Sequence, residues 1–444
     1  MYSLLYRKPA DAMKIIVDSH IPHIQGIIEP RAEVLYLEPE DITRDAVSDA
    51  DALIIRTRTR CHAALLDGSR VRFIGSATIG TDHIDLDYCA ARGITVCNAP
   101  GCNAPAVAQW VFCAINAWMQ ARGITTADGL SLGIVGVGHI GSIVARWAGQ
   151  LGFTVLLNDP PREMAEKTEG TEKTADGAHA KAQSREGLFW AAANAERTER
   201  TADGAHAKAQ RREGLFWAAA NAGGTGETEK TADGAHAKAQ RREELFWAAA
   251  NAERTERTER TENTGGTDGG FLPLEELQRR CDIITFHTPI TRDGQWPTWH
   301  LCDQAFLDAL DHCRLILDAA RGPIVDNEAL LRWHGDVALD CWENEPDISR
   351  ELLEKAIVAT PHIAGYSSQG KQRGTAMMLA ALNEFYGWDI PVPVIEAPAT
   401  GAVDVTLAGI AASYDILADT ARLKAAPATF ESLRNHYAHR PEYQ

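Results

Sequence analysis

The sequence predicts an α/β fold in which two doubly wound parallel sheets lie on either side of a cleft. Short apolar runs alternate with helix-length segments along most of the chain, a pattern typical of parallel sheets covered by helices. One apolar run leads through the glycine-rich loop GVGHIG into a helical segment. A long stretch of low-complexity repeats interrupts the alternation once, and we expect it to be an insertion.

The first unit is predicted from residues 13–103. Apolar runs rich in Ile, Val and Leu stand there between polar connections, and we expect them to be buried strands. The expected strands are 14–17, 53–55, 72–76 and 94–97. Connections of helix length separate them, so neighbouring strands are expected to run parallel.

The second unit is predicted from residues 104–361 and contains the glycine-rich loop. Helices are expected over 104–121, over about 140–151 and, beyond the repeats, over 274–281. Strands are expected at 134–135, 155–157, 282–287, 314–318 and 337–340. The alternation of these elements predicts a Rossmann-like sheet, with ligands at the carboxyl ends of its strands.

Two further segments complete the predicted organisation. Residues 362–390 are expected to return to the first unit through an amphipathic helix at 368–386. Residues 391–444 are a short C-terminal region and a candidate dimerisation segment. Because the first plausible strand starts at residue 14, the residues before Met13 are expected to be either a dispensable extension or the product of an upstream start.

The repeats are expected to form an insertion over 163–270, inside the second unit. TADGAHAKAQ begins at Thr174, Thr201 and Thr231, and each copy is followed by an arginine-containing linker and LFWAAANA. The period drifts and polar spacers separate the copies, which argues against a stacked solenoid. We expect a solvated, partly disordered surface loop, because little of it is apolar enough to offset the entropy of ordering. The alternative is an interaction module that presents the repeated LFW clusters.

The loop GVGHIG and the residues around it predict a site for NAD. Gly136 allows a tight turn, Gly138 lets the backbone approach a pyrophosphate, and Gly141 lets the next helix pack closely. That helix directs its N-terminal amides at the phosphates. Asp159, at the end of the next strand, is placed to accept both ribose hydroxyls and to repel a 2′-phosphate, which favours NAD over NADP. The expected contacts are Gly136, Gly138, His139, Ile140, Gly141 and Asp159.

Polar side chains also follow the ends of the later predicted strands. Arg321 follows LILDAA, Glu345 lies in ALDCWENEP and His362 follows IVATP. Taken singly, they read as a helix-capping arginine, a surface glutamate and a loop histidine. Taken together, they supply a base for a hydroxyl proton, a carboxylate that orients it, and an arginine that grips a substrate carboxylate. Asp340 is expected either beside a nicotinamide or as a strand-end cap.

Composition excludes several classes of function. A net charge of −17 argues against a nucleic-acid or anionic-membrane surface. The nine cysteines include no CxxC pair, so we expect reduced core residues and no metal site. The chain has neither an uninterrupted apolar run of membrane-spanning length nor the apolar centre of a signal peptide, and we expect a cytoplasmic protein.

The motifs GVGHIG, RGPIVD, CWENEP and TPHIAGY resemble those of the D-isomer-specific 2-hydroxyacid dehydrogenases. Within that family, the match is narrowest to members that oxidise 4-phospho-D-erythronate. It rests on VDSHIP, IIRTRT, GSATIGTDHID, APGCNAPAVAQWV, NDPPR, FHTPITRDG and HIAGYSSQGKQRGT. The resemblance covers about residues 13–390, apart from the insertion.

The resemblance implies NAD-dependent oxidation of 4-phospho-D-erythronate to 2-oxo-3-hydroxy-4-phosphobutanoate, a step toward pyridoxal 5′-phosphate. It implies that residues 13–103 begin a flavodoxin-like substrate domain, that 104–361 form the NAD domain, and that the enzyme is a homodimer. It implies a catalytic Arg321, Glu345 and His362, with His362 as proton acceptor. The other implied contacts are Asp159, Thr288, Asp340 and Gly365 for the cofactor, and Thr57, Thr78 and Tyr366 for the substrate.

A phosphorylated substrate requires cations, and the sequence offers several. Arg56, Arg58 and Arg60 follow a predicted strand of the first unit, and Lys371 and Arg373 begin the returning helix. Alternating arginines also occur on solvated strand faces, so both interpretations stay open for each residue.

Two departures and two alternatives accompany the resemblance. Asp318 stands where the family usually has Asn, and the C-terminal region is shorter than the family's dimerisation domain. One alternative is another dehydrogenase of the family, such as a phosphoglycerate dehydrogenase. The other is a non-catalytic NAD-binding scaffold that recruits partners through the LFW repeats.

Overall fold

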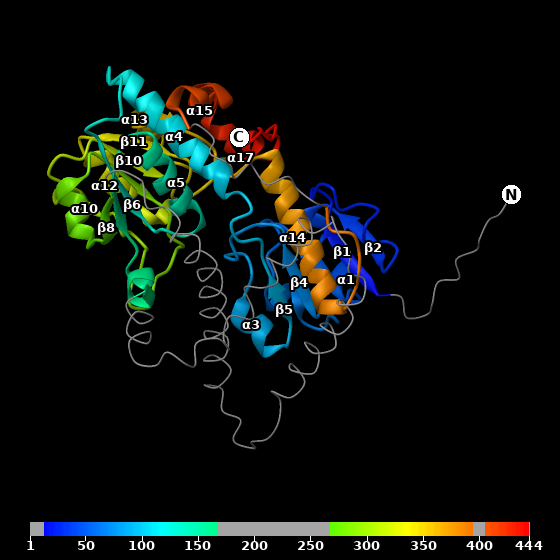
Figure 1. Ribbon diagram of the computed structural model, residues 1–444. Helices are drawn as coiled ribbons and strands as arrows, with labels where there is room; N and C mark the ends of the chain where they lie inside the picture. Colours follow the sequence, from blue (N-terminus) through cyan, green and yellow to red (C-terminus); the bar gives the residue numbers. More distant parts are fainter. Residues whose placement is uncertain (1–12, 167–266, 394–404, 444) are drawn as a thin grey trace, which may run out of the picture. The chain divides into compact units, whose positions relative to one another are not determined.

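The computed structural model describes residues 13–166, 267–393 and 405–443 (Figure 1). In this part of the chain, two sheets form in which every paired strand runs parallel to its neighbour, and helices cover both sheets. The predicted α/β fold with two doubly wound parallel sheets is therefore confirmed. The repeats at Thr174, Thr201 and Thr231 lie outside the described residues.

The first sheet has the strand order β2-β1-β3-β4-β5. Its strands are β1 (Lys14–Asp18), β2 (Glu33–Leu37), β3 (Ala52–Ile55), β4 (Phe73–Ser76) and β5 (Thr95–Cys97). Four of them correspond to the expected strands. β2 was not predicted from the sequence, because it is an edge strand that contains no fully buried residue.

Helices cover both faces of this sheet. They are α1 (Arg44–Val47), α2 (Ala63–Leu66), α3 (Leu86–Ala91) and α14 (Ser368–Tyr386), with a 3-10 turn η1 (Pro39–Asp41). Successive side chains of a strand point to opposite faces. Ile15 and Val17 therefore pack in one core with Met378 and Leu382 of α14, while Ile16 packs in a second core on the opposite face. Residues 368–386 thus form a helix that covers one face of the first sheet.

The second sheet has the strand order β12-β11-β10-β9-β6-β7-β8. Its strands are β6 (Ser131–Val135), β7 (Thr154–Asn158), β8 (Thr267–Phe271), β9 (Ile283–Phe286), β10 (Leu315–Asp318), β11 (Asp336–Leu339) and β12 (Val358–Ala359). From β6 the chain first builds toward β8 and then, starting with β9, builds in the other direction. Ligands of such sheets bind where the order reverses, which is here the carboxyl end of β6 and β9.

The second sheet is also covered on both faces. One core contains α4 (Ala104–Ala121) and α5 (His139–Gln150). The other contains α10 (Leu274–Arg280), α11 (Gln304–Asp308), α12 (Asn327–Arg332) and α13 (Arg350–Lys355), and the 3-10 turn η2 (Gly322–Ile324) follows β10. Trp110 and Trp118 of α4 are fully buried, and their indole nitrogens donate to Thr360 Oγ1 and Asp336 Oδ2, each over 2.9 Å. These bonds fix α4 to the ends of the sheet.

The expected bounds of the insertion are wrong at both ends. Residues 160–166 continue from β7 as helical turns, in which the Glu163 amide donates to Asp159 O over 2.9 Å. At the other end, β8 pairs with β7 as an edge strand, with Val155 opposite Thr267 and Leu157 opposite Phe271. The sequence TDGGF conceals this strand, because glycine and aspartate are depleted in strands.

The C-terminal region folds onto the second sheet. It forms α15 (Leu407–Ser413), α16 (Ile416–Ala425), the turn η3 (Pro427–Thr429) and α17 (Phe430–Asn435). Ile410 and Ile416 join the core around α4, and Leu423 and Phe430 join the core on the other face. Figure 1 shows these helices, in red, beside α4. From the sequence, this region was expected only as a candidate dimerisation segment, and its helices were not predicted.

The cysteines agree with the expectation from the sequence. All nine cysteines are free thiols, and eight of them are buried, as expected for reduced core residues. None of the described helices combines the length and the apolar character that crossing a bilayer requires.

Candidate active site

The glycine-rich loop lies between β6 and α5, and two of its glycines are required by the geometry. Gly136 has φ +87°, and a Cβ there would lie 2.9 Å from the carbonyl carbon and oxygen of His287. A Cβ on Gly141 would lie 2.1 Å from Gly136 O, so only glycine lets α5 pack this closely. A Cβ on Gly138 would meet nothing within 4 Å. The loop backbone is therefore open at Gly138, as a close approach by a phosphate requires.

Asp159 is held beside this loop by two backbone amides. Val137 N donates to Asp159 Oδ2 over 2.8 Å, and Arg162 N donates to Asp159 Oδ1 over 3.1 Å. The Arg162 guanidinium donates to Val137 O over 2.9 Å and lies 5.5 Å above the ring of Phe271. Since a carboxylate oxygen accepts two hydrogen bonds, both oxygens of Asp159 keep capacity for a ligand hydroxyl.

Thr288 and Gly365 lie at two other edges of the site. Thr288 Cγ2 is 2.9 Å from the position that a Cβ on Gly136 would take, so Thr288 lies directly beside the glycine loop. Thr288 Oγ1 is buried and has no hydrogen-bond partner among the described residues. A Cβ on Gly365 would lie 2.0 Å from Asn103 Nδ2, which keeps this turn close to the start of α4. An unsatisfied buried hydroxyl beside an open glycine loop fits a site that binds a polar ligand.

Asp340, at the end of β11, organises the loop that follows β12. Its Oδ1 accepts from Thr360 Oγ1 over 2.6 Å and from Ile363 N over 2.7 Å, and its Oδ2 accepts from Ala364 N over 3.0 Å. Burial raises the pKa of Asp340. His362 N also donates to Asp340 O over 2.9 Å. The structure therefore shows directly the strand-end cap that was one of the two expectations for Asp340.

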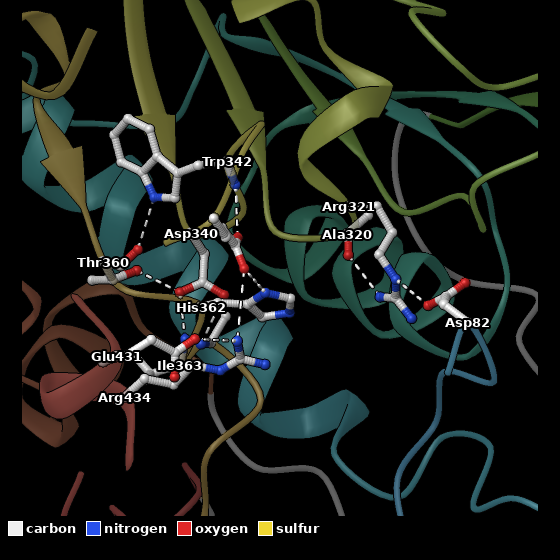
Figure 2. Close-up of polar contacts among 12 residues, drawn as sticks. Asp82, Ala320, Arg321, Asp340, Trp342, Thr360, His362, Ile363, Glu431 and Arg434 are labelled. Atoms are coloured by element: carbon white, nitrogen blue, oxygen red, sulfur yellow. Dashed lines mark hydrogen bonds and ion pairs between the residues drawn. The ribbon is translucent and has the colours of Figure 1, made fainter. Parts of the chain in front are cut away.

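His362, which is labelled in Figure 2, forms the central pair of the site with Glu345. His362 Nδ1 lies 2.9 Å from Glu345 Oε2, and Glu345 Oε1 accepts from Trp342 N over 2.9 Å. Burial alone would raise the pKa of Glu345. The charge and hydrogen bond of His362, together with the Trp342 amide and the charge of Arg434, leave this pKa below its ordinary value. The pair thus contains an ionised carboxylate that fixes one ring nitrogen. Within the described residues, His362 Nε2 has no hydrogen-bond partner, so it is the nitrogen that can face a substrate.

Arg321 follows β10 and connects the two sheets. Its Nη1 donates to Ala320 O over 2.7 Å, and its Nε donates to Asp82 Oδ2 over 3.1 Å (Figure 2). Asp82 is exposed and belongs to the loop after β4. A guanidinium with further unused N–H groups at this position can bind a carboxylate with two hydrogen bonds.

The three expected substrate residues fall into two places. Tyr366 OH lies 3.4 Å from Arg434 Nε, and Thr57 lines a pocket of about 310 Å³ together with Arg434. Thr78 lies elsewhere, with its Oγ1 2.8 Å from Ser76 Oγ. Ser76 Oγ in turn lies 3.3 Å from His83 Nε2. His83 follows Asp82, the residue that accepts a hydrogen bond from Arg321. Thr78 is therefore on the Arg321 side of the site, and Tyr366 and Thr57 are on the Arg434 side.

Arg434 is the residue of this site that the sequence analysis missed. It comes from α17, and its Nη1 lies 3.8 Å from Glu345 Oε2 (Figure 2). No motif marks it, because it stands in the C-terminal region, beyond residues 13–390, in which the family's motifs were recognised from the sequence. Only the packing of that region against the second sheet brings it to the His362–Glu345 pair.

Known proteins resemble this chain over nearly its whole length. A family model described as "D-isomer specific 2-hydroxyacid dehydrogenase, catalytic domain" matches residues 14–435. The erythronate-4-phosphate dehydrogenase of Bacteroides fragilis is 36% identical, over 97% of this chain and 97% of the relative. The enzyme of the same name from Bacteroides thetaiotaomicron is 34% identical, with the same coverage of both chains.

A solved structure supports the fold. The D-lactate dehydrogenase of Aquifex aeolicus, solved with NAD and lactic acid, aligns with a TM-score of 0.52 and 18% identity. The alignment covers 84% of this chain and 95% of that one. At this identity, the likeness speaks for the two-sheet fold alone.

Proposed function

The chain belongs to the D-isomer-specific 2-hydroxyacid dehydrogenase family, and from that premise we propose that it oxidises 4-phospho-D-erythronate to 2-oxo-3-hydroxy-4-phosphobutanoate with NAD. This reaction is a step toward pyridoxal 5′-phosphate. The observation that carries the proposal is the His362–Glu345 pair, with Nδ1 and Oε2 2.9 Å apart. It provides an oriented base at the carboxyl edge of a sheet whose glycine loop suits a dinucleotide.

The residues around the glycine loop fit NAD. The open backbone at Gly138, the N-terminus of α5 and the unsatisfied Thr288 hydroxyl offer donors for phosphate and amide groups. Asp159 offers acceptors for the ribose hydroxyls and repels a 2′-phosphate. When bound, NAD accepts the hydride that leaves C2 of the substrate.

The protein groups perform the rest of the chemistry. Arg321 binds the C1 carboxylate of the substrate and so fixes C2. His362 takes the proton of the C2 hydroxyl at Nε2, because Nδ1 is held by Glu345. The Glu345 carboxylate keeps the ring oriented and balances the charge that His362 gains. One hydride and one proton thus leave the substrate, and the C2 alcohol becomes a ketone.

The cation-rich pocket beside this pair favours a phosphorylated substrate. Thr57, Arg58, Arg60 and Arg434 line it, with Glu431 as its acidic member. The chain as a whole has a net charge of −17, so cations gathered at one place need a local cause. A phosphate at the far end of a short hydroxy acid is such a cause.

The test is an NADH-formation assay on the purified full chain. The panel contains 4-phospho-D-erythronate, D-erythronate, 3-phospho-D-glycerate and D-lactate, with NAD and separately with NADP, and His362→Ala serves as the inactive control. We expect the highest kcat/KM with 4-phospho-D-erythronate and NAD. A higher value with 3-phosphoglycerate would reassign the substrate within the family. No turnover of any 2-hydroxy acid would favour the non-catalytic scaffold.

Family membership also leads us to propose a cytoplasmic homodimer. Light scattering of the eluted protein measures the mass directly, and a mass of one chain at micromolar concentration would contradict the dimer.

A further inference from the structure

Side chains from three separate parts of the sequence converge on Tyr366. Arg434 Nε lies 3.4 Å from the Tyr366 hydroxyl, and Lys371 Nζ lies 4.1 Å from the centre of the Tyr366 ring. Arg56, from the end of β3, is close enough for its charge to act on both Tyr366 and Lys371. The three cations therefore surround one phenol next to the His362–Glu345 pair.

Carboxylates neutralise part of the positive charge of this cluster. Asp18 accepts from Arg56 Nε over 3.0 Å, and Glu345 binds His362. Arg434 Nη1 forms ion pairs with Glu431 over 3.7 Å and with Glu345 over 3.8 Å. Glu431 is shared with Arg58, and Glu345 is shared with His362. In the described part of the chain, no carboxylate pairs with Lys371. The positive charge of Lys371 is therefore an excess that no carboxylate of the described residues neutralises.

The titration of the two central groups reflects this excess. Burial lowers the pKa of Lys371, and the nearby charges of Arg56 and Arg434 lower it further. Burial would raise the pKa of Tyr366, but Lys371 and Arg434 outweigh it and leave the pKa below its ordinary value. Cations that repel one another destabilise the folded protein when they are held close together. Such an arrangement is expected at a site where a bound anion offsets the repulsion.

We infer that Arg434 and Lys371 bind the phosphate group of the substrate, and that α17 of the C-terminal region thereby completes the active site. The inference rests on the proposed function, because it assigns an end of the same substrate. Arg434 contacts both Tyr366 and the carboxylate of Glu345, the partner of His362. One end of a short substrate can therefore bind Arg434 while its C2 hydroxyl lies at His362. Specificity for a phosphorylated over an unphosphorylated hydroxy acid then depends on a residue outside both sheets.

The experiment compares Arg434→Met and Lys371→Met with a matched control, Arg422→Met. Arg422 also lies in the C-terminal region, but it is exposed and pairs with Asp419 three residues earlier. For each full-length protein, kcat/KM is measured with 4-phospho-D-erythronate and with D-erythronate. Binding of inorganic phosphate is measured separately by calorimetry, which requires no turnover. Circular dichroism melting shows whether each variant is folded.

We expect Arg434→Met to lower kcat/KM for the phosphorylated substrate by about 10- to 100-fold, the effect of losing a charge-assisted hydrogen bond. The kcat/KM for D-erythronate should stay within about twofold of the parent value, while the affinity for inorganic phosphate falls. Arg434→Lys should restore part of the kcat/KM for the phosphorylated substrate. Lys371→Met acts in the same direction, and Arg422→Met behaves as the parent.

Three outcomes separate the alternatives. An equal loss with both substrates, accompanied by a shifted pH profile, would overturn the inference and make Arg434 a positioning residue for Glu345. Unchanged phosphate binding and unchanged kcat/KM in a folded Arg434→Met would also overturn it, while the proposed function stands. Phosphate binding that depends on Arg434 in a protein that does not oxidise 4-phospho-D-erythronate would uphold the anion site and reject the proposed substrate.

Discussion

Nδ1 of His362 lies 2.9 Å from Oε2 of Glu345, and this contact determines which ring nitrogen faces the substrate. The two residues are 17 positions apart in the sequence and follow different strands of one sheet. The Asp340 carboxylate fixes the loop that contains His362, because it accepts hydrogen bonds from the amides of Ile363 and Ala364. A base fixed in this way needs little reorganisation when it takes a proton.

His362→Ala should lower kcat by about 10²- to 10⁴-fold, because a positioned general base is lost. NAD affinity should be nearly unchanged, since the glycine loop and Asp159 are untouched. Stopped-flow kinetics and a fluorescence titration with NAD measure the two quantities. His334→Ala, at an exposed position, is the control. A kcat close to that of the parent would remove His362 from the chemical step.

Glu345→Gln should move the pH at which kcat/KM is half-maximal downward by about one unit or more. His362 lowers the pKa of Glu345, so the carboxylate is ionised throughout the assay range and attracts the positive charge that forms on the ring during catalysis. The neutral amide keeps the shape but removes this attraction, and the base form is then available at lower pH. A pH–rate profile from pH 5 to 9 makes the measurement. A profile that coincides with that of the parent would rule out this role.

Asp159→Ala should weaken NAD binding by about 10- to 100-fold and narrow its advantage over NADP, since ribose hydrogen bonds and repulsion of the 2′-phosphate are both lost. Asp159 also accepts from Val137 N, so part of the loss reflects a looser loop. Asp159→Asn separates the two effects, because the amide oxygen still accepts a bond while the charge is gone. Asp128→Ala, at an exposed position before β6, is the control. Titrations that show the same NAD to NADP ratio in all four proteins would place Asp159 outside the ribose site.

Replacing residues 170–263 with a Gly/Ser linker of about 12 residues should leave a folded enzyme of similar kcat. No residue placed at the site lies within this range, and the replacement keeps the helical turns at 160–166 and all of β8. The longer replacement of 163–270 removes four of the five residues of β8, and it should lower the melting temperature and weaken NAD binding. If the shorter replacement abolished folding or turnover at saturating NAD, the repeats would be part of the working structure.

Arg440→Met should lower the free energy of unfolding by about 3 kcal/mol, the upper end for unsatisfied buried groups. The buried guanidinium donates to Ile363 O over 3.0 Å and to Ala106 O over 3.1 Å, and it also contacts Ala364 O. These carbonyls would lose their partner together. Urea denaturation measures the change, and Arg422→Met, which is exposed, should stay within about 0.5 kcal/mol of the parent. An equally small effect for Arg440 would show that the C-terminal region is only loosely attached to the loop of His362.

The sequence by itself determined the parallel α/β fold and most of its elements. Helices 104–121 and 368–386 have the bounds expected from their apolar periodicity. In long periodic segments, the local sequence is enough to predict the helix. The glycine loop and the strand-end residues were also readable, because each depends on a short motif in a strand–loop context. Edge strands were harder to predict. β2 has no fully buried residue, and β8 consists largely of residue types that rarely form strands.

Only the tertiary structure decided which side chains meet. Glu345 and His362 follow different strands, and their contact requires the register of β11 beside β12. Arg434 could not be assigned from its own neighbourhood, because a single arginine on a six-residue helix carries no local signal. Its position follows from Leu423 and Phe430, which bury the C-terminal region in the core of the second sheet and thereby bring a distant cation to Tyr366. Burial of apolar surface chooses such partners without regard to their distance along the chain, and for that reason they cannot be read from sequence patterns alone.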